Sequence, residues 1–257
     1  MILEKFDKER EAIINPEMIV PKNPNMPKTA VSCFSQKLID EVLSFFPYEE
    51  VGKIKSANGS QTVYSIQYKD KRTALYMSKV GAPACVVNYE EVMAMGVENL
   101  VLFGTCGCLD KNISDCSVIV PEYALRDEGT SYHYMPQSDE IKVNSDKDIK
   151  IFESILNEHS CSFTKGKVWT TDGLYRETRE KMEKRRESGC IAVDMECSAM
   201  AAVSKFRNKE FFQFFYAADN LDNVSWDKRS LGCGKKLDVK MKIAVLAFEM
   251  AYKMENG

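Results

Sequence analysis

Residues 191–203 read IAVDMECSAMAAV, which indicates a buried strand that turns directly into a helix. The apolar run ends in two acids, Asp194 and Glu196, that flank Met195. Residues two positions apart in an extended chain point the same way, so both acids face one side and Met195 faces the other. Acids are rarely buried without partners, which indicates a ligand with hydroxyl groups or internal pairing. The plain alternative is that they cap the helix beginning near Ser198, whose dipole favours acids at its N-terminus.

A second strand that ends in small residues lies earlier in the chain. Residues 99–109 read NLVLFGTCGCL, an apolar run that breaks into a short turn containing glycine. Backbone N–H groups in such a turn can approach an anion or a polar ligand closely. A lone pair of glycines is weak evidence for a site, so the two stretches have to be considered together.

The GTCG turn and the VDMECSAM junction together resemble the hexameric nucleoside phosphorylase family, which includes uridine phosphorylases and bacterial-type purine nucleoside phosphorylases. Further matching segments follow the family's order from about residue 29 to the C-terminus: VGAPA at 80–84, RDEGTSYH at 126–133, TTDGLY at 170–175 and AADN at 217–220. The resemblance implies a single α/β domain with a central mixed β-sheet flanked by helices, in a three-layer architecture.

Composition narrows the class of protein and its surroundings. The chain has 257 residues, of which 44% are hydrophobic and 28% charged, as in an ordinary globular protein. The net charge is −3, and the chain has no long block of charged residues of one sign. We therefore expect no nucleic acid and no membrane as partner. Residues 1–10 lack the apolar core of a signal peptide, which predicts a cytoplasmic protein. The nine scattered cysteines are expected to be reduced, and their spacing predicts no metal site.

Strand-like and helix-like segments alternate along the chain, which is typical of an α/β protein. Four prolines between residues 15 and 28 predict an extended lead-in over 1–28, lying on the surface or on a neighbouring subunit. A single catalytic domain then spans 29–257. Strands are predicted at residues 29–33, 62–68, 73–78, 100–103, 117–120, 167–171, 191–195 and 211–217. Helices are predicted at residues 36–46, 85–95, 146–158, 177–187, 198–206 and 235–254.

The resemblance places the ribose of a nucleoside at the junction after residues 191–195. An ionised Glu196 can accept hydrogen bonds from both ribose hydroxyls, and its charge favours the cationic sugar that forms as the base departs. Met195 matches the family residue that packs on the ribose face. His133 is a further candidate for the 5′ side of the ribose, with a structural histidine in a polar loop as the alternative.

The resemblance also assigns the leaving base. In the purine-cleaving members, an aspartate in the position of Asp219 donates a proton to the base. The ordinary pKa of an Asp is about 3.9, so burial or proton sharing must assist, and Arg229 is a candidate helper. The alternative is that Asp219 and Asn220 form a turn. Leu174 and Tyr175 match the family's base-packing positions, whereas the Gln and Arg that read uracil have no evident match.

Phosphate binding is where this chain departs from the family, whose members hold phosphate with arginines. The corresponding positions here are Cys33 and Lys37, Leu102, and the Asn58–Gly59 region. The remaining candidates for phosphate are the Gly104 and Thr105 amides and the point charge of Lys37. Arg126 or Arg176 are possible substitutes from other loops.

The expected protein is therefore a pentosyltransferase, a nucleoside phosphorylase that converts a nucleoside and phosphate reversibly into free base and ribose 1-phosphate. A purine is slightly favoured over uridine, and no metal or organic cofactor is implied. One rival is a hydrolytic nucleosidase of the same fold, although residues 32–36 lack the acid with which related nucleosidases activate water. A rival of another class is a non-catalytic nucleoside-binding protein. The resemblance further implies a homo-oligomer, either a dimer or a trimer of dimers.

Overall fold

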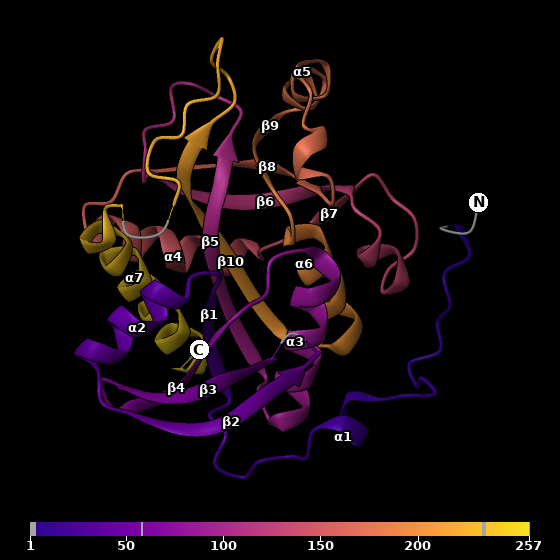
Figure 1. The fold of residues 1–257 in the computed structure, drawn as a ribbon, viewed down its shortest axis with the longest axis vertical. Helices are drawn as coiled ribbons and strands as arrows, with labels where there is room; N and C mark the ends of the chain where they lie inside the picture. The colour runs from indigo at the N-terminus through magenta and orange to yellow at the C-terminus, as the bar shows by residue number, and fades with distance from the viewer. Residues whose placement is uncertain (1–3, 58, 233–234, 257) are drawn as a thin grey trace.

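The computed structural model describes residues 4–57, 59–232 and 235–256, with a mixed β-sheet through its centre (Figure 1). Over these residues the strand order is β10-β6-β8-β9-β5-β1-β4-β3-β2, and β7 pairs with β6. The strands are β1 (Thr29–Cys33), β2 (Tyr48–Ser56), β3 (Gly59–Tyr68), β4 (Lys71–Met77), β5 (Asn99–Cys108), β6 (Val118–Asp127), β7 (Glu140–Lys142), β8 (Phe163–Thr171), β9 (Cys190–Asp194) and β10 (Glu210–Asn220). The predicted central mixed sheet is confirmed.

Strand β5 lies at the centre of the sheet because it pairs with three other strands. Parallel β10 runs along one whole edge of β5. The other edge is shared, with β1 beside residues 99–103 and β9 beside Gly107 and Cys108. A strand has only two edges, so on this edge residues 104–106 of β5 lie in a gap between the end of β1 and the end of β9, which runs antiparallel to β5. This gap opens at the carboxyl ends of β1 and β4, where ligands of α/β proteins bind.

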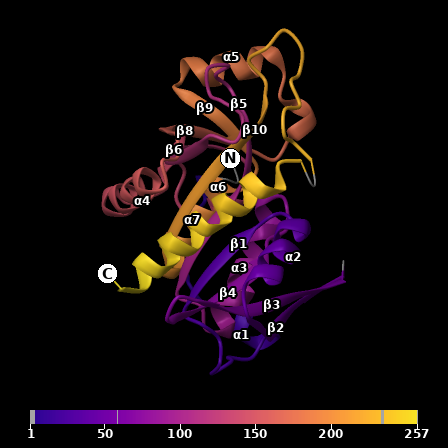
Figure 2. The same cartoon turned by 90° about the vertical axis from the view of Figure 1, so that its left-hand side faces the viewer.

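Helices cover both faces of the sheet (Figure 2). One core lies between the sheet and α3 and α6. A second core lies on the opposite face, under α2, α4 and α7. The helices are α1 (Pro16–Ile19), α2 (Gln36–Phe45), α3 (Ala82–Met95), α4 (Asp146–Glu158), α5 (Arg179–Glu187), α6 (Cys197–Arg207) and α7 (Leu237–Asn256), with 3-10 turns η2 (Thr130–His133) and η3 (Leu174–Arg176). The three-layer α/β architecture expected from the sequence is therefore present.

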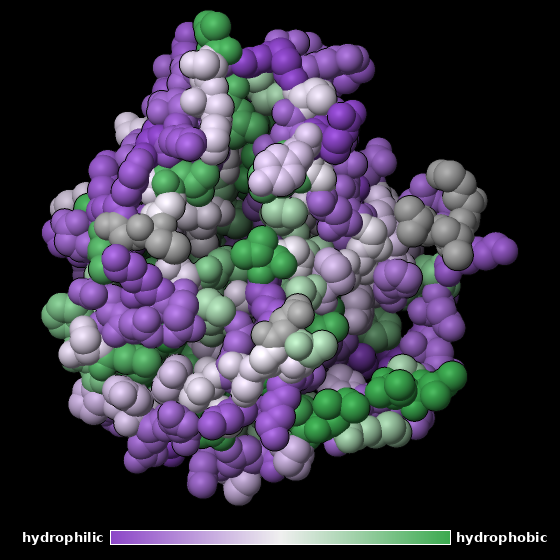
Figure 3. Space-filling view, in the orientation of Figure 1, coloured by the Kyte–Doolittle hydropathy of each residue, from purple (hydrophilic) through white to green (hydrophobic). Residues whose placement is uncertain are grey.

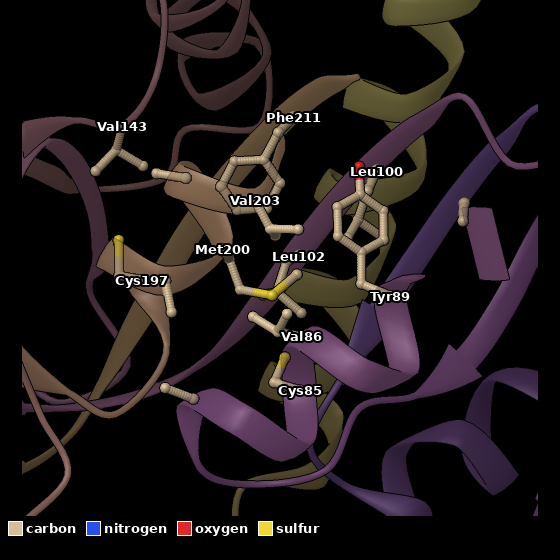
Figure 4. Close-up of a cluster of buried hydrophobic side chains, with 14 of the residues drawn as sticks. Cys85, Val86, Tyr89, Leu100, Leu102, Val143, Cys197, Met200, Val203 and Phe211 are labelled. Atoms are coloured by element: carbon tan, nitrogen blue, oxygen red, sulfur yellow. The ribbon is translucent and has the colours of Figure 1, made fainter. Parts of the chain in front are cut away.

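The two cores follow from the alternation of side chains along β5. Val101 and Phe103 point into the core under α7. The neighbouring residues point to the other face and join an interlocking set from α3, β5 and α6 in Figure 4: Cys85, Val86, Tyr89, Leu100, Leu102, Met200 and Val203. This packing fixes α6, and with it the β9–α6 junction, against the middle of the sheet.

Most predicted elements are present, and the differences have physical causes. The first strand and the helix at residues 146–158 match the prediction, and the two neighbouring strands β3 and β4 are antiparallel as expected. Strand β2 was not predicted, because most of its residues are exposed and carry no apolar alternation. Helix α3 begins three residues earlier than predicted, since Pro83 occupies its first turn, where proline is tolerated.

The lead-in and the cysteines can also be placed. Residues 16–19 form the short helix α1, and the buried Val20 and Met26 attach this segment to the core around α3. The eight cysteines of the described ranges are free, in agreement with the reduced state expected; Cys233 lies outside those ranges. None of the helices in the described ranges has the length and apolar character required to cross a membrane.

Candidate active site

The β9–α6 junction is organised by the carboxylate of Asp194, which ends β9. Its Oδ2 accepts hydrogen bonds from the amides of Glu196 (2.8 Å) and Cys197 (2.6 Å) at the start of α6. Its Oδ1 accepts a hydrogen bond from the Thr170 hydroxyl at 2.7 Å. Asp194 thus satisfies amides that the first turn of a helix leaves without partners. The sequence left three explanations open for these acids: a ligand, internal pairing or helix capping. For Asp194, internal pairing and capping apply.

Glu196 has a different environment from Asp194. It occupies the N-cap position of α6, yet its side chain makes no capping hydrogen bond. Instead its Oε1 accepts a hydrogen bond of 2.5 Å from the amide of Gly81, in the loop between β4 and α3. Gly81 has a φ of 97°, a conformation that favours glycine, and this conformation belongs to the loop that points the amide at Glu196. Only 6% of the surface of Glu196 is exposed.

Both acids at this junction have a raised pKa, and burial is the largest cause for each. Burial raises the pKa of Glu196 well above its usual range, and the neighbouring Asp194 carboxylate adds to the shift. Burial also raises the pKa of Asp194, although its amide and hydroxyl donors oppose this. A ligand that brought hydrogen-bond donors to Glu196 would favour its ionised form. The junction is therefore suited to a ligand with neighbouring hydroxyl groups.

Two further predicted ribose residues differ in their placement. Met195 is partly exposed between the two acids, so its side chain remains accessible from the site. His133 is exposed at the last position of η2, which packs against α6. Within the described ranges, no hydrogen bond joins its imidazole to Glu196. The role of His133 at the ribose stays a prediction.

Asp219 lies near the end of β10, just after a bulge. The register between β10 and β5 shifts after Ala217, so that Asp219 lies opposite Gly107. Bulges of this kind re-aim side chains beside active sites. Oδ2 of Asp219 accepts a hydrogen bond of 2.8 Å from the indole nitrogen of Trp226. The alternative of a turn at Asp219 and Asn220 is wrong, because β10 continues through both residues.

The charge of Asp219 is controlled by burial and by two neighbours. Burial raises the pKa of its carboxyl group, whereas the Trp226 hydrogen bond and the charge of Arg229 lower it. Arg229 does not bind Asp219 directly. Its guanidinium donates to Asp227 at 3.3 Å and to the carbonyl of Ile113 at 2.7 Å. Arg229 therefore influences Asp219 at a distance, and a catalytic role for Arg229 stays a prediction.

A cavity of about 480 Å³ opens beside Asp219, between the loop after β10 and helix α5. Figure 3 shows this hollow with apolar side chains along its walls. Its lining residues are Leu174, Tyr175, Glu177, Arg179, Met182, Asp219, Leu221, Trp226 and Leu231. The structure thus brings the predicted base-packing residues to the same cavity as the predicted proton donor.

Sequence reasoning missed one acid in this cavity. Burial and the nearby charges of Asp219 and Asp194 raise the pKa of Glu177 to about 7, while Lys181 lowers it. A carboxyl group with such a pKa carries a proton for much of the time near neutral pH. The signal available in the sequence was its position, two residues after Tyr175.

The phosphate end of the site differs from the prediction. Gly104 and Thr105 do not form a turn, because β5 continues through them and pairs with β10. The ring of Phe34 lies against Gly104, where a side chain's Cβ would approach it to 2.6 Å. Thr105 is exposed in the gap of the sheet, and Lys37 is exposed in the first turn of α2. The predicted nest of amides is therefore not present, because Gly104 and Thr105 are part of an extended strand.

The two candidate substitute arginines are also placed. Arg126 is buried, and its guanidinium donates to Ser131, Ser138 and the carbonyls of Met135 and Pro136. These bonds hold the loop after β6, so Arg126 is not available for phosphate. Arg176 is exposed in η3, with no assigned role. Asn58, which corresponds to a family arginine, lies outside the described residues.

The fold and the site together define a three-layer α/β protein with buried acids at the β9–α6 junction and a cavity beside Asp219 near the end of β10. The family model of the Phosphorylase superfamily matches residues 28–245, so the chain belongs to this superfamily. The resemblance derived from the sequence is confirmed. In the described ranges, no group of three or more His, Cys, Asp or Glu side chains is arranged to hold a metal ion.

Known relatives and solved structures agree with this assignment. The chain is 23% identical to the purine nucleoside phosphorylase DeoD-type of Brevibacillus brevis, over 70% of this chain and 78% of that protein. Its fold is similar to uridine phosphorylase from Vibrio fischeri, with a TM-score of 0.76, 20% identity and coverage of 95% and 100%. It is also similar to purine nucleoside phosphorylase from Toxoplasma gondii in complex with immucillin-H, with a TM-score of 0.76, 16% identity and coverage of 91% and 94%.

Proposed function

We propose that this protein is a nucleoside phosphorylase that cleaves the bond between a base and its ribose, with phosphate as the nucleophile. The observation that carries the proposal is a pair of acids at the ends of two strands, Glu196 after β9 and Asp219 near the end of β10. Glu196 is buried at the β9–α6 junction, and Asp219 lines the neighbouring cavity. We infer a slight preference for purine nucleosides over uridine, since Asp219 suits a base that must be protonated.

Glu196 would act on the sugar. Its ionised carboxylate would accept hydrogen bonds from the two ribose hydroxyls, and its charge would stabilise the positive charge that develops at the anomeric carbon. Met195, partly exposed beside it, would pack on the ribose face. The hydrogen bond from Gly81 fixes one oxygen of Glu196 before any ligand arrives. This preorganisation favours the transition state.

Asp219 would act on the base. As the bond between the anomeric carbon and the base nitrogen breaks, its electron pair passes to the base, and a proton from Asp219 neutralises that charge at the imidazole nitrogen. A phosphate oxygen forms the new bond to the anomeric carbon from the opposite face. The products are the free base and ribose 1-phosphate, and no cofactor enters this step.

Phosphate would bind at the gap in the sheet. On the edge of β5 that faces away from β10, residues 104–106 are paired with neither β1 nor β9, and Thr105 is exposed. The candidate cation is Lys37, which lies in the first turn of α2, the helix that follows β1. A lysine gives a point charge and not the two-pronged contact of arginine, so we expect weak phosphate binding.

The test is release of base from inosine and uridine, with and without phosphate. We expect release that depends on phosphate and yields ribose 1-phosphate. Equal rates in both conditions, with free ribose as product, would instead establish the hydrolytic nucleosidase. Nucleoside binding without product in either condition would establish the non-catalytic binding protein.

We further propose that the protein is a homo-oligomer, a dimer or a trimer of dimers. The exposed apolar side chains of Ile13, Ile14, Met18 and Ile19 on the lead-in support an interface between copies. Analytical ultracentrifugation at micromolar concentration checks this state. A monomer there would contradict the proposal.

A further inference from the structure

Glu177 is held at a fixed position on the wall of the cavity beside Asp219. It follows directly after the 3-10 turn η3, whose Arg176 amide donates to the carbonyl of Gly173 at 2.7 Å. The next residue, Thr178, caps α5 by accepting a hydrogen bond from the amide of Lys181. The backbone of Glu177 is therefore fixed from both sides, which is the geometry required of a residue that recognises a ligand.

The carboxyl group of Glu177 makes no hydrogen bond within the described part of the chain, and the charge of Lys181 acts on it only at a distance. In the described ranges, no side chain or amide donates a hydrogen bond to it, whereas Asp219 in the same cavity binds Trp226. The other acids around this site have partners: Asp194 binds two amides and a hydroxyl, and Glu196 binds Gly81. The Glu177 carboxyl group lines the cavity and is available there to hydrogen-bond a ligand.

We propose that Glu177 is the residue that recognises the base, by pairing with a base edge that carries a hydrogen-bond donor next to an acceptor. The inference rests on the proposed function and deepens it. It separates two tasks among the acids of the cavity: Asp219 delivers the proton on which cleavage depends, and Glu177 selects the base. The edge in question is that of a purine with an oxygen or amino group at position 6.

The chemistry of a protonated carboxyl group fits this task. Such a group presents one O–H donor and one carbonyl acceptor side by side. This pair matches the O6 and N1–H of hypoxanthine or guanine, and equally the N1 and amino group of adenine. The charges of Asp219 and Asp194 favour the protonated form, since they raise the pKa of Glu177 to about 7 together with burial. Purine riboside, which lacks the group at position 6, cannot complete the pair.

Glutamine provides a sharp test, because its amide also presents a donor beside an acceptor and has the same size. We expect wild type to favour inosine over purine riboside by about tenfold in kcat/KM, the effect of one hydrogen bond at a partly exposed site. Glu177→Ala should reduce this preference to within about twofold, and Glu177→Gln should retain most of it. The matched control is Glu183→Ala, an exposed acid on α5 away from the cavity, which should leave the preference unchanged.

Direct binding tests the inference even without turnover. Calorimetric titration of the free bases hypoxanthine and purine into wild type and the three variants should show the same loss of preference in Glu177→Ala alone. A preference unchanged in Glu177→Ala, by kinetics or by binding, would overturn the inference while leaving the proposed function intact. If no nucleoside is cleaved but the preference in binding still depends on Glu177, then the proposed function fails and the role of Glu177 in recognition stands.

Discussion

The two ends of the proposed nucleoside site, a ribose end at the β9–α6 junction and a base end in the cavity beside Asp219, are built in opposite ways. At the ribose end, Asp194 and Glu196 are each 6% exposed and are fixed by amides of the helix start and of a distant loop. At the base end, Tyr175 is 96% and Trp226 54% exposed, and both belong to loops or a short turn. Every nucleoside carries a pentose, whereas the base varies. The rigid junction therefore suits the shared part of a substrate, and the loops suit the variable part.

The largest effect should come from Glu196→Gln, because it alters the end that serves every substrate. We expect kcat to fall by about 10²–10⁴ on all cleaved nucleosides, whatever their base. Steady-state rates on inosine, guanosine, adenosine and uridine check this. The control is Glu98→Gln, an exposed acid paired with Lys28 on the surface. Full activity in Glu196→Gln would mean that the ribose end has been wrongly identified.

Asp219→Asn should have an effect that depends on the base. On inosine we expect a loss of about 10²–10⁴ in kcat, since the base must be protonated as it leaves. On 7-methylinosine, whose base already carries a positive charge, the loss should be less than about tenfold. The ratio of the two rates in wild type and variant is the measurement. Equal losses on both substrates would contradict the division between the two ends.

A smaller effect is expected from Trp226→Phe, which removes the hydrogen bond to Asp219. That bond lowers the pKa of Asp219, so its loss should raise this pKa. A general acid is active only while protonated, so the alkaline fall-off of inosine cleavage should move to higher pH. The shift should be to higher pH only, because the lost hydrogen bond stabilises the charged form of Asp219. A pH–rate profile that does not move would show that another group controls the fall-off.

The smallest effect concerns stability at the ribose end. The ordinary pKa of a Glu is about 4.3, and burial raises that of Glu196 in the folded protein. Between the ordinary and the raised pKa, the folded protein therefore binds more protons than the unfolded chain. Stability from this group is therefore lost as the pH rises through that range. Glu196→Gln has no charge to bury and should melt a few degrees above wild type at about pH 9, with little difference at about pH 5. A variant that melts lower at both pH values would contradict this account.

The sequence allowed the architecture and the strand-to-helix junction with its two acids to be predicted, because both depend on local patterns. Apolar runs that alternate with amphipathic segments identified most strands and helices, and the acids after residues 191–195 marked the junction. For these acids the sequence did not decide between helix capping and ligand binding. Only the structure separates them, since the amide that binds Glu196 comes from Gly81, far away in the sequence.

Features that depend on pairing between distant strands could not be predicted. The glycines of residues 104–107 indicated a turn, yet β10 pairs with this stretch and keeps it extended. The bulge that places Asp219 opposite Gly107 leaves no local signal in either strand. From the sequence, Arg126 was a candidate phosphate ligand. The structure shows that its guanidinium instead donates hydrogen bonds to the loop that follows β6. In each case the partner lies on another element.

The hydrogen bond between Gly81 and Glu196 joins residues 115 positions apart, and this separation affects how the protein is made. A chain growing on the ribosome cannot complete its ribose pocket until Glu196 has emerged and both segments have docked. Contacts of such long range form late and slowly in folding. A nucleoside would therefore bind only fully assembled chains, and at a hundredfold excess over its Kd it would stabilise them by about 2.7 kcal/mol. Substrate supply would then help set how many newly made chains survive proteolysis.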